Sequence, residues 1–177
     1  MKRKSALLAL AVGFLMAASV QAVPTTYQYT GNPFTTVSGP YTTSDFVTAM
    51  ITLATPLGPN FSGSVSPIAF TFSDGVQTIT NLNATFSSFF FQTGPTGAII
   101  GWVVNGFVPG GHVASLGSAG LGADEGESID GRGLNSNQPG TWAMVGVVPD
   151  TGSTLSLMTL TLMALGLVAR RFQRPAV

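Results

Sequence analysis

The stretch IAFTFS-DG-VQTIT, residues 68–80, contains the strongest structural pattern in this chain of 177 residues. Apolar and polar residues alternate on both sides of Asp74-Gly75, as they do in strands that bury one face. An Asp-Gly pair suits the left-handed backbone of a two-residue hairpin turn. We therefore predict a β-hairpin here, with Asp74 as a turn residue and not a catalytic carboxylate.

Short segments of the same kind extend this pattern in both directions. Residues 45–53 alternate, and the face predicted to be buried carries Val47, Ala49, Ile51 and Leu53. Further strands are expected at residues 25–30, 84–93, 99–105 and 141–147, while the Gly-rich residues 106–140 are expected to form long surface loops. The predicted fold is all-β, an antiparallel β-sandwich of seven or eight strands, with a closed barrel as the alternative.

The N-terminus has the three parts of a secretory signal peptide. Lys2, Arg3 and Lys4 precede an apolar run over residues 6–18, and small residues end the segment at Ala22. We predict a signal helix over residues 1–22, with signal peptidase and the export machinery as partners and cleavage between Ala22 and Val23. Residues 23–147 are then long enough for one ectodomain with a single core.

The C-terminus combines a short motif, an apolar run and a basic cluster. The apolar run over residues 155–169 is followed by Arg170, Arg171 and Arg174. Nineteen uncharged positions lie between Asp150 and Arg170, and as an α-helix they would reach about 28 Å, close to one hydrocarbon core. We predict a transmembrane helix whose C-terminal end faces the cytoplasm, because basic residues favour that side.

The motif before this helix consists of Val148, Pro149, Asp150, Thr151, Gly152, Ser153 and Thr154. Motif, helix and arginines over residues 148–177 together resemble the PEP-CTERM class of sorting tails, in particular the VPDSG-CTERM variety, although Thr151 stands where that variety has Ser. The resemblance implies that an exosortase of a Gram-negative bacterium cuts near the motif. The ectodomain would then pass from the inner membrane to the cell surface or the extracellular polymer matrix.

Part of the ectodomain has a resemblance of its own. Residues 27–36, 39–46 and 70–75 are similar to a recurrent set of PEP-CTERM proteins. This second resemblance supports export and implies no activity.

Two other kinds of anchoring tail share features with this segment. Val148 to Gly152 also fits the x-Pro-x-Thr-Gly pattern of sortase-anchored wall proteins, although Val148 would fill the pocket for Leu less well. A eukaryotic lipid-anchor signal requires a polar spacer before its apolar tail, and here the apolar run follows the motif directly. The sortase reading stays open as an alternative.

Charge and cysteine content exclude several functions. Six of the seven basic residues lie in the two terminal segments, so the ectodomain has six carboxylates against Arg132 alone, a formal charge of minus five. This charge argues against nucleic acid or an anionic membrane surface as a partner. The chain has no cysteine, which excludes disulfides, thiol nucleophiles and thiolate metal sites.

Four carboxylates lie within seven residues, and they are Asp124, Glu125, Glu127 and Asp130. Carboxylate oxygens on flexible backbone are ligands that Ca²⁺ accepts, so these residues are calcium candidates. Their spacing differs from that of the EF-hand loop, and a solvated loop is the favoured interpretation. They also suit glycoside hydrolysis poorly, because that chemistry places two carboxyls on opposite sides of the bond.

The remaining candidates for chemistry are one histidine and a group of aromatic residues. His112 lies near Ser115 and Asp124 in sequence, but no nucleophile motif surrounds them, so we expect a loop histidine without a role. The aromatic group is either core or a platform for a sugar ring, and it contains Phe86, Phe89, Phe90, Phe91, Trp102 and Trp142. In a strand, at least one of the three consecutive phenylalanines must face away from the others.

These observations predict an exported, non-enzymatic protein with a structural or adhesive role and no cofactor. The alternative is a carbohydrate-binding surface module. Extracellular polysaccharide is a candidate partner for both.

Overall fold

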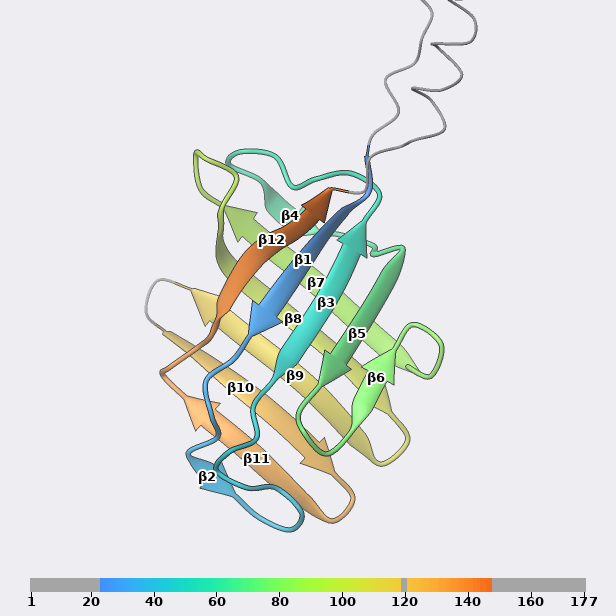
Figure 1. The fold of residues 1–177 in the computed structure, drawn as a ribbon, viewed down its shortest axis with the longest axis vertical. Helices are drawn as coiled ribbons and strands as arrows, with labels where there is room; N and C mark the ends of the chain where they lie inside the picture. Colours follow the sequence, from blue (N-terminus) through green and yellow to red (C-terminus); the bar gives the residue numbers. More distant parts are fainter. Residues whose placement is uncertain (1–22, 119–120, 148–177) are drawn as a thin grey trace, which may run out of the picture.

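A computed structural model describes residues 23–118 and 121–147, and this part of the chain forms two packed antiparallel sheets (Figure 1). In spatial order, the five-stranded sheet contains β12 (Thr141–Val147), β1 (Thr25–Thr30), β3 (Thr48–Leu53), β5 (Ala69–Ser73) and β6 (Thr78–Thr80). The seven-stranded sheet contains β2 (Thr36–Val37), β11 (Gly131–Ser136), β10 (Leu121–Ser128), β9 (Gly111–Ser118), β8 (Ile99–Val108), β7 (Phe86–Thr93) and β4 (Ser62–Ser64). The predicted all-β sandwich is therefore confirmed in its class, whereas the expected seven or eight strands were too few.

The alternation predicted over residues 45–53 is confirmed by the burial of its side chains. Val47, Ala49, Ile51 and Leu53 are all buried, and Met50 on the opposite face is half exposed. The hairpin over residues 68–80 also forms, with β5 and β6 paired from Ser73 opposite Thr78. Its turn contains four residues and not two, because the Asp74 carboxylate accepts the backbone N–H groups of Val76 and Gln77 and so organises a longer loop.

The region expected to be surface loops, residues 106–140, instead contains the end of β8 and all of β9, β10 and β11. The glycines that suggested loops lie on the inner face of these strands. A Cβ atom at Gly117 would overlap the Trp102 ring, and one at Gly133 would overlap the Phe34 ring. Glycine is required here because large rings occupy the space that side chains would fill.

The core between the sheets is strongly aromatic. Tyr29, Phe72 and Phe91 are almost completely buried, and Phe72 stacks on Phe89 at a centroid distance of 5.8 Å. Of the three consecutive phenylalanines, Phe89 and Phe91 face this core, whereas Phe90 lies on the opposite face and is half-buried. The prediction that one ring of the run faces away is confirmed.

The predicted signal helix (1–22), the motif (148–154), the transmembrane helix (155–169) and the arginine cluster (170–174) lie outside the described residues. Within residues 23–118 and 121–147, no helix has both the length and the apolar character needed to cross a bilayer.

Candidate functional site

The outer face of the seven-stranded sheet carries a row of side chains that runs across five strands. Direct cross-strand pairs connect Phe86 on β7 to Phe107 on β8, Phe107 to His112 on β9, His112 to Glu127 on β10, and Glu127 to Arg132 on β11. Side chains of directly paired residues in antiparallel strands are near neighbours on one face. The row therefore changes from aromatic to charged along its length, and His112 lies where the two halves meet.

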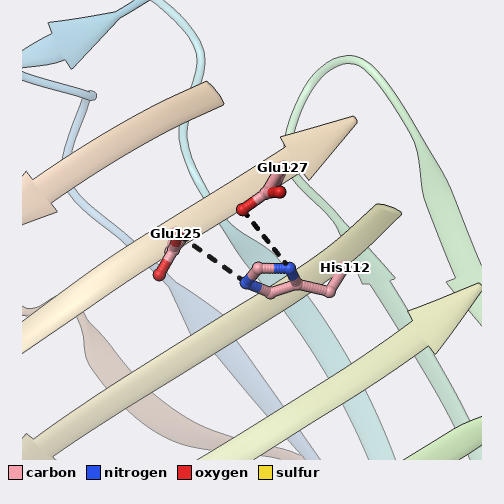
Figure 2. A group of neighbouring side chains, drawn as sticks. All are labelled: His112, Glu125 and Glu127. Atoms are coloured by element: carbon pink, nitrogen blue, oxygen red, sulfur yellow. Dashed lines mark ion pairs between the residues drawn. The ribbon is translucent and has the colours of Figure 1, made fainter. Parts of the chain in front are cut away.

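His112 and Glu127 of this row form a compact group with Glu125, which precedes Glu127 by two residues in β10 (Figure 2). The Nε2 atom of His112 lies 3.7 Å from Oε1 of Glu125, and its Nδ1 atom lies 3.9 Å from Oε2 of Glu127. Glu125 and Glu127 are two positions apart in β10, so strand alternation places both on the same face. We call His112, Glu125 and Glu127 the His-Glu-Glu cluster.

Two neighbours constrain the cluster. The Phe107 ring stacks on the His112 ring with a centroid distance of 5.2 Å and an interplanar angle of 26°. The Arg132 guanidinium forms an ion pair with Glu125, in which Nε lies 2.5 Å from Oε1. The Arg132 side chain therefore holds Glu125 in place, whereas the Glu127 side chain is 52% exposed.

The cluster supports two kinds of chemistry. Its three ligand atoms, one from each residue, lie within 4.8 Å of one another, so together they can approach one cation. The two ring nitrogens also face two different carboxylates, so the cluster can take part in an electrostatic network with Arg132.

The four calcium candidates do not form one site. Glu125 and Glu127 lie on the outer face, whereas Asp124 is buried between the sheets and Asp130 lies in the turn between β10 and β11. One ion cannot reach carboxylates on both faces of a sheet. The expectation of a solvated loop is also wrong, because residues 124–127 belong to β10.

The buried Asp124 carboxylate belongs to a hydrogen-bonded group in the core. Tyr29 on β1 donates its phenolic proton to Asp124, with Oη at 2.7 Å from Oδ1, and the N–H of Gly140 donates to the Tyr29 oxygen. Burial raises the pKa of the Asp124 carboxyl above its usual range, and the hydroxyls of Ser115 and Tyr29 oppose that rise. Burial, followed by the charge of Asp124, raises the pKa of Tyr29.

Asp74 has a similar buried environment at the hairpin turn. Its Oδ2 atom accepts the phenolic proton of Tyr41 at 2.7 Å and an amide proton of Gln77 at 2.9 Å. The same Gln77 amide nitrogen donates to the backbone oxygens of His112 and Glu127, so this turn is tied to the other sheet. The prediction that Asp74 is a turn residue is confirmed, and the carboxylate is fully buried as well.

The histidine does not form a triad with the residues near it in sequence. Ser115 and Asp124 lie between the sheets, where the Ser115 hydroxyl accepts a proton from Trp102 Nε1 at 2.8 Å. His112 is on the opposite face of the same strand as Ser115, so neither Ser115 nor Asp124 is within its reach. The expectation of a loop histidine was wrong, because His112 lies within β9.

The aromatic candidates divide between core and surface. Trp102 is buried and Trp142 is half-buried, and both pack against Tyr29 at centroid distances of 5.6 and 5.1 Å. A sugar platform built on Trp102 is therefore excluded. Phe86 is 60% exposed, and its ring centroid lies 5.8 Å from that of the partly exposed Phe107.

Two cavities formed by described residues have volumes of about 260 and 290 Å³. The first is lined mainly by residues 53–57, and the second mainly by residues 96–99 and residues 142–144. Tyr27 lines the second cavity, and the described residues around both include no carboxylate or imidazole. The His-Glu-Glu cluster and the cavities are therefore in different parts of the sandwich.

Comparisons with protein-family models, with curated proteins and with solved structures found no match to this chain.

Proposed function

We propose that the chain is an exported cell-surface or extracellular-matrix protein, and that an exosortase removes its C-terminal tail near Val148 to Gly152. The observation that carries this proposal is how the ends of the β-sandwich relate to the two terminal signals. β1 begins at Thr25, three residues after Ala22, and β12 ends at Val147, directly before the motif. Thr25 and Val147 are paired across adjacent strands, so both ends leave the domain at one end (Figure 1).

This arrangement supports a sequence of processing events. Signal peptidase and exosortase would act at neighbouring points on the folded body, and no linker separates β12 from the motif. While the tail helix is in the inner membrane, the domain would be held close to the membrane surface by its β1–β12 end. Cutting the tail would release the whole sandwich toward the cell surface.

A structural or adhesive role is supported by the outer face of the five-stranded sheet. A row of hydroxyl side chains crosses all five strands through direct pairs, and it contains Thr141, Thr30, Thr48, Ser73 and Thr78. Hydroxyl groups both donate and accept hydrogen bonds, so such a row suits contact with neutral extracellular polysaccharide.

A carbohydrate-binding module is the second candidate, and the Phe86–Phe107 pair favours it. Exposed rings offer faces on which a sugar can pack, and this pair lies beside the polar His-Glu-Glu cluster. A sortase-anchored wall protein is the other alternative, since Val148 to Gly152 fits that signal too.

Variants of the motif test the proposed processing. We expect Pro149→Ala to leave the full-length chain in the inner-membrane fraction, because the cutting enzyme reads the motif. Thr151→Ser is the matched control, since it restores the residue found in the VPDSG-CTERM variety, and it should be processed as well as the parent. Release of the Pro149→Ala protein at the parental rate would contradict the proposal.

A further inference from the structure

We propose that the His-Glu-Glu cluster binds one divalent transition-metal ion of the zinc type on the outer face of the seven-stranded sheet. The inference is independent of export and of tail processing. It rests on three ligand atoms within 4.8 Å of one another, supplied by His112 on β9 and by Glu125 and Glu127 on β10.

The residue types select the class of ion. Imidazole and carboxylate are ligands of Zn²⁺, whereas Ca²⁺ takes oxygen ligands alone and needs six to eight of them. A cluster with one nitrogen and two carboxylates leaves a fourth position for water. His112 is the sole histidine of the chain, so an imidazole-dependent site has one possible location.

The scaffold holds two of the ligands and leaves the third adjustable. The Phe107 ring restricts the His112 imidazole by stacking on it, and the ion pair with Arg132 restricts the Glu125 side chain. Tetrahedral zinc with bonds of about 2.0 Å brings its ligand atoms to about 3.3 Å from each other. The ligand atoms now lie within 4.8 Å of one another and must approach more closely, which rotation of the half-exposed Glu127 side chain allows.

To bind one ion together, both carboxylates must lie beside the ring nitrogen that binds it. At present Glu125 faces Nε2 and Glu127 faces Nδ1. Rotation of the Glu127 side chain toward Nε2 achieves this, because Glu125 already faces that atom. Arg132 opposes binding, since its guanidinium is paired with the Oε1 atom that faces His112. Removal of Arg132 should therefore tighten metal binding, a result that a purely structural ion-pair network does not predict.

The test is a Zn²⁺ titration of the purified full-length chain in detergent, without a polyhistidine tag, in competition with a chromogenic chelator. We expect one Zn²⁺ per chain, and we expect His112→Ala and Glu127→Gln each to weaken binding by at least about 10-fold, the lower end of the loss seen when even outer-shell partners are removed. Asp130→Asn is the matched control, because it removes a carboxylate of the same hairpin outside the cluster. Arg132→Ala should bind Zn²⁺ more tightly than the parent.

A second readout locates the ion without any variant. The ring protons of the single histidine should shift on Zn²⁺ addition and remain unchanged with equimolar Ca²⁺. The proposal is overturned if the parent binds no Zn²⁺, if His112→Ala binds it as well as the parent does, or if the histidine signals do not respond.

Discussion

The phenolic oxygen of Tyr29 on β1 lies 2.7 Å from a carboxylate oxygen of Asp124 on β10, so one hydrogen bond joins the two sheets through the core. Asp124 is completely buried and its usual solvation by water is absent. The Tyr29 ring in turn packs against Trp102 and Trp142. This pair makes the centre of the sandwich sensitive to both substitution and pH.

Removing the Tyr29 hydroxyl should destabilise the fold, because the buried Asp124 carboxylate loses the hydrogen bond from Tyr29. We expect Tyr29→Phe to lower the free energy of unfolding by about 1–3 kcal/mol, the usual cost of an unsatisfied buried group. Urea unfolding followed by tryptophan fluorescence measures this loss. The same substitution in an Asp124→Asn background should cost less, and an equal cost in both backgrounds would show that the pair is not coupled.

The raised pKa of Asp124 predicts how stability depends on pH. In the unfolded chain an aspartate titrates near about 3.9. Between that value and the raised pKa of the folded state, the folded state keeps a proton that the unfolded chain has released. The free energy of unfolding therefore decreases as the pH rises through this window.

The Asp124 contribution is obtained as a difference between the parent and Asp124→Asn, because all other titratable groups are common to both proteins. We expect the stability of the parent minus that of Asp124→Asn to be highest below pH about 3.9 and to fall to a plateau above the folded pKa. Urea unfolding at a series of pH values measures it. A difference that rises with pH over the same range would be the opposite of this prediction.

The inward glycines predict a sharp contrast between two similar substitutions. At Gly117 an added methyl group would overlap the Trp102 indole, so we expect Gly117→Ala to cost about 1–3 kcal/mol. A Cβ at Gly146 in β12 has no neighbour within 4 Å, and Gly146→Ala should change stability by less than about 0.5 kcal/mol. Equal effects in thermal or urea unfolding would show that Trp102 can move aside.

The carbohydrate-binding alternative makes its own prediction about which rings matter. Phe86→Ala and Phe107→Ala should weaken binding to extracellular polysaccharide, because these rings are exposed on the face beside the His-Glu-Glu cluster. Leu82→Ala is the control, since Leu82 is 91% exposed and lies in the β6–β7 connection. Binding that is insensitive to both phenylalanines, measured by polysaccharide co-sedimentation, would argue against this alternative.

Local alternation was enough to predict part of the fold. The buried face of residues 47–53 and the hairpin over residues 68–80 could be identified because each pattern is complete within a few residues. The strands between residues 106 and 136 could not, because most of their inward positions are glycines or polar residues and not large apolar side chains. Those glycines make room for rings such as Phe34 and Trp102 that are distant in sequence, so the reason for them appears only in three dimensions.

The sequence also predicts only part of the His-Glu-Glu cluster. The spacing of Glu125 and Glu127 already places both on one face of a strand, a signal available once that segment is known to be β. Their meeting with His112 depends on the register between β9 and β10, which the sequence pattern does not determine. Proximity in sequence groups Asp124 with these glutamates, but strand alternation directs its side chain into the core.

The central claim, that the chain is processed at its tail and released to the cell surface, is tested most directly by intact mass. The protein is recovered from cell surface and medium, in parent cells and in cells that lack the exosortase. We predict that the parent protein begins at Val23 and has lost the residues after a cut near Pro149, and that the tail is retained in cells without the enzyme. An unprocessed tail in both strains would contradict the account.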